Sequence, residues 1–189
     1  MSGHSKWKTI KHKKETADQK RGQIFSKLIN AISIAAREEP NPQFNARLRA
    51  AIEKAKENKV PQENIERAIN RASEDKNLEE LIIEAYGPEG AAILIEAITD
   101  NKNRTIAEIK KILSDNNAKF AEAGSVRWAF EQAWGQTQTD AEKGPRGSAP
   151  MGWQAKFKQE ISEEAREKLQ ELIAELEEHD AVQGVYTNS

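Results

Sequence analysis

The stretch that decides the fold class is LIIEAYGPEGAAILI, residues 81–95. Two apolar runs, 81–83 and 91–95, flank Gly87-Pro88-Glu89-Gly90, whose residue types are those of tight turns. Short apolar runs on either side of such a turn are typical of a β-hairpin, here with a four-residue turn. The sequence therefore predicts a sheet that begins near residue 79.

Upstream of this hairpin, residues 25–72 show the period of helices. Apolar residues recur three and four positions apart from Phe25 to Ala36, which indicates one helix that ends before Pro40. Two more helices are indicated over 44–55 and 61–72, with Pro61 near the first turn of the second. Because each helix alone would be marginal in water, the three are predicted to share an apolar core.

Downstream of the hairpin, helix and strand patterns alternate. A helix is predicted at about 103–115 and a strand near 119–121, followed by a half-buried strand over 126–130 with Trp128 on its buried side. Residues 132–153, rich in Gly, Pro, Thr, Gln and Ser, predict a loop. A long helix that opens at Ser162 and a short strand over 182–186 cannot bury themselves, so they are expected to complete the sheet, with both helices on one of its faces.

The predicted fold class is therefore α+β, with an N-terminal three-helix domain followed by an α+β sandwich lobe that has an antiparallel or mixed sheet. The predicted domains are a basic arm plus helical bundle over 1–77, a discontinuous α+β domain over 78–131 and 154–189, and a flexible loop over 132–153. Residues 2–14, SGHSKWKTIKHKK, have no clean period and are interpreted as an extended arm.

Charge is distributed unevenly, although the net charge of the chain is only −2. Residues 1–27 carry eight Lys or Arg against two acidic residues, and residues 1–76 have a net charge of +7 against −9 for the remainder. Clustered cations release counterions from a polyanion, so the basic segment predicts a nucleic-acid ligand. The alternative is a solvated basic tail, and a membrane surface is disfavoured because the segment lacks an apolar face.

Two local features add to this prediction, each with a second interpretation. Trp7 either stacks on an exposed base or anchors the arm on the protein. Residues 100–105 lie between a predicted strand and a predicted helix, where free N–H groups and Arg104 could bind a phosphate. An ordinary capped turn with surface charges explains the same residues equally well.

Catalysis has little support in the sequence. The chain has no cysteine, its three histidines lack metal-ligand spacing, and there is no Gly-x-Ser-x-Gly elbow and no phosphate-binding Gly-rich loop. The protein is therefore predicted not to be an enzyme, without catalytic residues, metal site, cofactor or small-molecule substrate. No apolar run reaches the roughly 18 residues of a membrane span, and a secretory signal is not indicated, so no membrane partner and a cytoplasmic location are expected.

Several stretches resemble the YebC/PmpR family. They keep their order over residues 2–131 and again over 155–187. The matching stretches are GHSKW at 3–7, IKHK at 10–13, KRG at 20–22, FSKL at 25–28, PQENIERAI at 61–69, YGP at 86–88, TDNKNRT at 99–105, GSV at 124–126 and DAVQGVY at 180–186.

The resemblance implies a cytoplasmic bacterial or organellar protein that binds DNA as a probable transcriptional regulator. Family members that resemble translation factors imply the alternative, which is contact with rRNA on the ribosome. A third hypothesis is a protein-interaction module that uses the acidic lobe. The nucleic-acid-binding residues implied are Lys6, Trp7, Lys8, Lys11, His12, Lys13, Lys14, Lys20, Arg21 and Lys27, followed by Asn103 and Arg104.

The chain departs from the family pattern in two ways. Ala85 and Glu89 stand where the family usually has Gly, and Ala46 replaces a usual Pro. The family also inserts a whole α+β lobe between the parts that match residues 131 and 155. Residues 132–153 are therefore predicted to replace that lobe.

Overall fold

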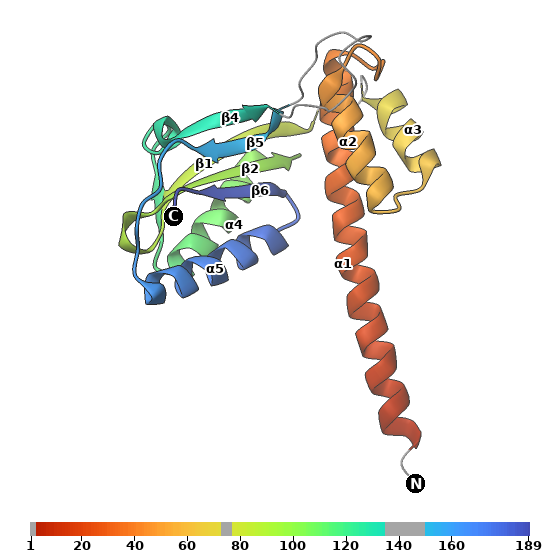
Figure 1. The fold of residues 1–189 in the computed structure, drawn as a ribbon. Coiled ribbons are helices and arrows are strands. Elements are labelled where there is room, and N and C mark those ends of the chain that lie inside the picture. Colours follow the sequence, from red (N-terminus) through yellow and green to blue (C-terminus); the bar gives the residue numbers. More distant parts are fainter. Residues whose placement is uncertain (1–2, 73–76, 135–149) are drawn as a thin grey trace.

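A computed structural model describes residues 3–72, 77–134 and 150–189, and its helices and two sheets confirm the predicted α+β class (Figure 1). The helices are α1 (Gly3–Glu38), α2 (Ala46–Glu57), α3 (Gln62–Arg71), α4 (Lys102–Asp115) and α5 (Glu163–Glu178). The first sheet contains β1 (Glu79–Tyr86), β2 (Ala92–Thr99), β3 (Lys119–Ala121) and β6 (Val182–Thr187). The second contains β4 (Phe130–Trp134) and β5 (Pro150–Ala155).

The second half of α1 packs with α2 and α3 around a common core, which confirms the predicted helical bundle. Ile32 of α1, Leu48 of α2 and Ile65 of α3 are all buried in it. The buried Asn45 holds the start of α2 in place, since its Oδ1 accepts a hydrogen bond from Leu48 N at 2.9 Å and its Nδ2 donates to the Ala35 carbonyl at 2.7 Å. One side chain therefore both caps α2 and ties it to α1.

The start of α1 differs from the sequence prediction. The helix begins at Gly3, so the expectation of an extended arm over residues 2–14 is wrong. Residues 4–21 contain no Pro or Gly and include six Lys and one Arg, long unbranched side chains that favour helix without a packed apolar face. Figure 1 shows this part of α1 extending beyond α2 and α3, and a helix without a neighbour needs no apolar period.

The four strands of the first sheet lie in the order β3-β1-β2-β6, and every neighbouring pair is antiparallel. β1 and β2 form the predicted hairpin, with Tyr86 opposite Ala92, so its connection is one residue longer than expected. β6 pairs along the other side of β2, from Ile93 opposite Thr187. The expectation that the C-terminal segment completes the sheet is therefore confirmed.

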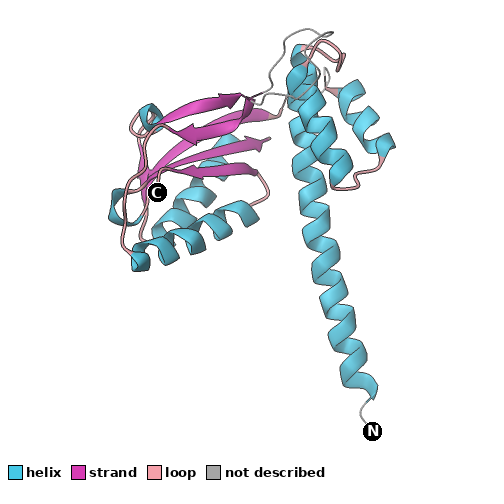
Figure 2. Cartoon of the chain, in the orientation of Figure 1, coloured by secondary structure: helices cyan, strands magenta, loops and turns pink. Residues whose placement is uncertain are grey.

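The sheet is the middle of three layers (Figure 2). Helices α4 and α5 cover one face, where Ile95, Ile109 and Leu172 are fully buried, as the prediction of both helices on one face requires. The β4–β5 hairpin covers the opposite face over a smaller core that includes Leu94 and Phe130. The sequence patterns did not indicate this second sheet.

The predicted strand over 126–130 is wrong in its first part. Residues Arg127–Ala129 form a 3-10 turn, and β4 begins only at Phe130. Glu84 holds this turn, because its buried carboxylate accepts hydrogen bonds from the backbone N–H groups of Gly124, Val126 and Arg127 at 2.6, 2.7 and 3.0 Å. Trp128, expected on the buried side, is instead 62% exposed.

The loop predicted over 132–153 is shorter than expected at both ends. β4 continues to Trp134 and β5 begins at Pro150, and the two strands pair antiparallel. Gly152 lies inside β5 at a φ of +117°, where a Cβ would come within 2.4 Å of the Tyr186 hydroxyl. A glycine that indicates a loop in the sequence therefore permits close packing in the structure. The rest of the predicted loop, 135–149, lies outside the described residues, so its flexibility and its replacement of a lobe stay predictions.

Glu89, one of the departures from the family pattern, connects two elements. Its backbone is left-handed, with φ 53° and ψ 20°, a conformation that favours glycine. Its carboxylate accepts hydrogen bonds from Ser162 N at 2.9 Å and Ser162 Oγ at 2.7 Å. Because Ser162 is the N-cap of α5, the turn between β1 and β2 is held against the start of that helix.

Candidate nucleic-acid interface

Most of the predicted nucleic-acid-binding residues lie along the first part of α1, on a single continuous helix. Positions 6, 13, 20 and 27 are all lysine. A spacing of seven residues is nearly two helical turns, so these four backbone positions lie along one side of α1. The predicted residues whose side chains are outside the described part are Lys6, Trp7, Lys8, Lys11, His12, Lys13 and Lys14.

Lys20 and Lys27 reveal which way this side of α1 faces. Lys20 Nζ donates to a Glu178 carboxylate oxygen at 2.9 Å, and Lys27 Nζ donates to the Glu177 carbonyl at 2.5 Å. Burial lowers the pKa of Lys27, and the nearby negative charges of Asp180 and Glu177 oppose that shift. The lysine side of α1 therefore faces the acidic C-terminal end of α5, which already occupies two of its four lysines.

Arg21 lies on α1 between these two lysines and has a different environment. Its guanidinium carbon is 5.2 Å from the centre of the Phe25 ring, which is a cation–π contact. Arg21 is exposed, and its contact partner belongs to its own helix. The charge of Arg21 therefore stays on the surface of α1 beside the lysine side.

Contacts near the C-terminal end of α1 attach the helix to the first sheet. The Arg37 guanidinium donates to the Leu78 carbonyl at 2.6 Å, just before β1. Ile34 of α1 packs with Leu78 and Ile98 in a small buried cluster. The direction of the basic helix is therefore fixed by the same residues that join it to the α+β part of the chain.

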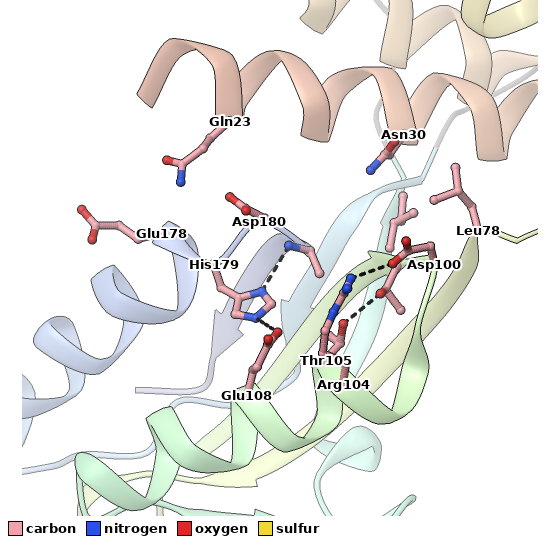
Figure 3. A pocket seen from close by; sticks show the side chains of 13 residues that line it. Gln23, Asn30, Leu78, Asp100, Arg104, Thr105, Glu108, Glu178, His179 and Asp180 are labelled. Atoms are coloured by element: carbon pink, nitrogen blue, oxygen red, sulfur yellow. Dashed lines mark hydrogen bonds and ion pairs between the residues drawn. The ribbon is translucent and has the colours of Figure 1, made fainter. Parts of the chain in front are cut away.

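A cleft of about 800 Å³ lies between α1 and the ends of β2 and α5 (Figure 3). Gln23 and Asn30 line it from α1, and residues of α4 line the opposite side. Its charged lining is mainly acidic: Asp100, Glu108, Glu178 and Asp180 against Arg104. An anion would therefore meet more negative than positive charge in this cleft.

The turn before α4 contains the second predicted group, and its geometry is that of a capped helix. Asn101 is the N-cap, since its Oδ1 accepts a hydrogen bond from Arg104 N at 3.1 Å, while Asn103 is exposed on the first turn. The Arg104 guanidinium is paired with Asp100 at 2.7 Å. The geometry thus favours the interpretation as an ordinary capped turn, and phosphate binding by Asn103 and Arg104 stays a prediction.

His179 is held in this cleft at both ring nitrogens. Nε2 lies 3.0 Å from a Glu108 carboxylate oxygen, and Nδ1 accepts a hydrogen bond from Ala181 N at 3.1 Å. These bonds fix the ring between α4 and α5 rather than leaving it open to a ligand. Within residues 3–72, 77–134 and 150–189, no cluster of three or more His, Cys, Asp or Glu is arranged to hold a metal ion. In the same part of the chain, no helix is long and apolar enough to cross a membrane.

Fold and interface together define a class of protein: an α+β protein whose long basic helix extends from a helical bundle beside a three-layered acidic part. Comparison with known families agrees with this class. Residues 5–75 match the TACO1/YebC protein N-terminal domain, and residues 78–144 match the TACO1/YebC second and third domain. The chain belongs to the TACO1/YebC family, which confirms the resemblance found in the sequence.

Relatives in this family carry names that describe regulators. A probable transcriptional regulatory protein of Dehalococcoides mccartyi is 50% identical over 135 residues, covering 69% of this chain and 54% of that protein. One of Thermoanaerobacter pseudethanolicus is 53% identical over 136 residues, covering 70% and 55%. The chain thus spans about half the length of the curated relatives it matches. A crystal structure of a conserved hypothetical protein from Aquifex aeolicus aligns with a TM-score of 0.77 and 31% identity, covering 90% of each chain.

Proposed function

We propose that this protein is a cytoplasmic regulatory protein that binds the phosphate backbone of nucleic acid along the first part of α1, with duplex DNA as the first choice. The observation that carries the proposal is the density of cations on that helix, eight Lys or Arg within residues 1–27. Such a row gains free energy by releasing counterions from a polyanion. The names of the relatives, probable transcriptional regulatory proteins, support a regulatory role.

The dimensions of the helix suit a duplex. At 1.5 Å per residue, residues 3–27 span roughly 37 Å, close to the ~34–36 Å of one turn of DNA. An α-helix is also narrow enough for the major groove. Seven of the eight cations are lysines, which act as point charges without the two-pronged geometry that reads guanine. These lysines therefore provide no direct readout of bases, and a preferred duplex site would have to be distinguished by the shape of the DNA.

The same lysine content favours a second candidate function, a translation factor that contacts rRNA on the ribosome. Sequence-blind contact with phosphates serves a structured RNA as well as a DNA duplex. In either function, nucleic acid competes with the end of α5 for the side of α1 that carries Lys20 and Lys27. The acidic residues around Glu178 then limit affinity and favour ligands with dense charge.

Salt dependence of binding tests the proposal. The logarithm of the affinity for duplex DNA should fall linearly with the logarithm of salt concentration, by about 0.9 for each phosphate contacted. Changing Lys6 and Lys13 to Gln should make the slope shallower by about 1 for each lost contact. The matched control changes Lys54 and Lys56 to Gln on α2, where both are exposed, and should leave the slope as it is.

Two further measurements separate the candidate functions. A transcriptional regulator should prefer a selected duplex site over random duplex by at least ~10³. A translation factor should show only sequence-blind duplex binding and should sediment with ribosomes, less so after the Lys6 and Lys13 changes. If the slope, the affinity and the sedimentation are all the same in the Lys6/Lys13 variant and the control, the proposed function is wrong. A partner captured through the acidic part would then favour the protein-interaction module.

A further inference from the structure

Two exposed aromatic rings stack on each other where β4 begins and β5 ends. Trp128 is 62% exposed and Phe157 is 44% exposed, and their ring centroids are 5.4 Å apart with an interplanar angle of 28°. Figure 1 shows that β4 begins and β5 ends at the end of the sandwich that lies away from α1. We call this pair, Trp128 and Phe157, the aromatic platform.

The aromatic platform is fixed in orientation rather than loosely attached. The Trp128 indole N–H donates to the Ser125 carbonyl at 2.8 Å, and the Tyr86 hydroxyl donates to the same carbonyl at 3.0 Å. Glu84 holds the turn that carries Trp128 through three backbone hydrogen bonds. With Phe157 against one face of the indole and most of the indole exposed, a flat apolar surface is held open to solvent.

The charge around the platform differs from that of the surrounding lobe. Lys156 and Lys158 flank Phe157, both are exposed, and neither forms an ion pair with another residue in the described part of the chain. Arg127, also exposed, precedes Trp128 and lies over the Trp153 ring at 5.2 Å. Residues 77–189 have a net charge of −9, whereas residues 127–131 and 156–160 together carry three cations, Arg127, Lys156 and Lys158, against Glu131 and Glu160, so the segments that hold the rings are not acidic.

We propose that the aromatic platform is a second nucleic-acid-binding site, which stacks an unpaired base of a single-stranded segment while Arg127, Lys156 and Lys158 contact its phosphates. Aromatic rings stack on every base, and lysines between them provide the charge that the backbone needs. A duplex hides its base faces within the stack and therefore cannot use this surface. The inference extends the proposed nucleic-acid-binding function, but it rests on different residues from those of α1.

The sequence patterns missed this site because alternation assigned Trp128 to the buried side of a strand. The Lys156-Phe157-Lys158 triplet was the available indication, since it places one aromatic side chain between two cations. A protein partner with an acidic, apolar surface would also meet exposed rings and cations here. Stacking distinguishes the two, because a base adds affinity that its phosphate alone does not.

The test compares oligonucleotides with and without bases on the full chain. The probes are a short oligouridylate, an oligothymidylate and an abasic oligodeoxynucleotide of equal length, with affinities measured by fluorescence anisotropy at one salt concentration. Trp128→Ala should weaken binding of the two base-containing probes roughly 5- to 150-fold, the range for loss of one stacked base. Trp128→Phe should restore most of the affinity, and the abasic probe should bind all variants equally.

A matched control is Phe44→Ala, since Phe44 is 75% exposed and lies before α2, away from the platform. The Phe44→Ala variant should bind all three probes with the affinity of the unaltered chain. With a bromouridine-containing probe, ultraviolet crosslinks should map to the peptide that contains Trp128. Preference for oligouridylate over oligothymidylate would identify RNA as the ligand, and equal affinity would identify any single strand.

The outcomes separate this inference from the proposed function. If Trp128→Ala binds oligouridylate as tightly as the unaltered chain, or loses the abasic probe to the same extent, base stacking at the platform is ruled out. If the Lys6 and Lys13 changes have no effect but Trp128→Ala does, the platform binds nucleic acid and the α1 proposal fails. If the Lys6 and Lys13 changes weaken binding but Trp128→Ala does not, the α1 proposal stands and the platform inference is overturned.

Discussion

Glu84 should be the polar side chain whose loss destabilises the α+β part of the chain most sharply. Changing it to Ala removes three acceptor contacts at once. The Val126 N–H is buried and would be left without a partner, which costs about 1–3 kcal/mol. The N–H groups of Gly124 and Arg127 are partly buried and can turn to water, so each bond adds only about 0.5–1 kcal/mol. The expected loss in the free energy of unfolding is therefore about 3 kcal/mol.

Glu84→Gln refines this expectation, because an amide keeps one acceptor oxygen. One carboxylate oxygen serves both Val126 and Arg127, so an amide oxygen in that place retains two of the three bonds. The amide nitrogen would then face the Gly124 N–H, and a loss of about 1 kcal/mol is expected. The assay is urea-induced unfolding followed by circular dichroism. Glu79→Ala, an exposed change on the same strand, is the control and should stay within about 0.5 kcal/mol of the original.

The stabilisation by Glu84 should also depend on pH in a defined direction. Burial alone would raise the pKa of this carboxyl, but the three backbone donors and the Arg127 charge outweigh burial and place the pKa below its ordinary value of 4.5. A lowered pKa means that the stabilisation is complete above pH 4.5 and is lost as the pH falls through the folded-state value. The difference between the original chain and Glu84→Gln should shrink on acidification. A difference that is constant or grows would refute the reasoning.

Four other changes give independent checks. Leu172→Ala, in the core between α5 and the first sheet, should cost about 2–5 kcal/mol in urea unfolding, and a value below 1 kcal/mol would contradict the packing. Asn45→Ala should cost about 2–3 kcal/mol in the same assay, and Asn45→Asp should also destabilise, because it keeps the cap but places a carboxylate oxygen against the Ala35 and Glu39 carbonyls. Gly152→Ala should cost about 1–3 kcal/mol because of its backbone conformation and the nearby Tyr186 hydroxyl, and an unchanged thermal midpoint would count against this register of β5. Glu178→Gln should release Lys20 and tighten duplex binding in anisotropy measurements at low salt, while unchanged affinity would mean that α5 does not compete with the ligand.

Much of the fold was predictable because the relevant patterns are local. The β1–β2 hairpin, α4 and α5 each have a period or a turn that identifies them from their own residues. The second sheet was not predictable in this way, because β4 begins only after a turn that Glu84 fixes from 40 or more positions away. The glycine pattern also led to a wrong prediction. In the sequence Gly152 is typical of a loop, but in the structure it lies inside β5, where the missing Cβ leaves room for the Tyr186 hydroxyl.

The candidate interface was likewise predictable only in those features that depend on neighbouring residues in the sequence. The excess of cations in residues 1–27 is visible in the composition, and so is their lysine content. The seven-residue spacing places four lysines on one side only if the segment is a helix, and the sequence pattern predicted an extended arm instead. The engagement of Lys20 and Lys27 by the end of α5, about 150 positions away, has no local pattern at all. A composition can therefore identify which charges are present but not which of them are already neutralised.

The order of strands in the first sheet has a consequence for synthesis. β2 is a central strand with Ile93, Leu94 and Ile95 fully buried, yet its partner β6 follows roughly 80 residues later. At about 5–20 residues per second, translation leaves one edge of β2 without its partner for about 4–16 s. During that interval the nascent chain presents an apolar strand edge that can pair with other chains. The yield of native protein should therefore depend on how quickly residues 100–187 are translated and on whether a chaperone covers β2 meanwhile.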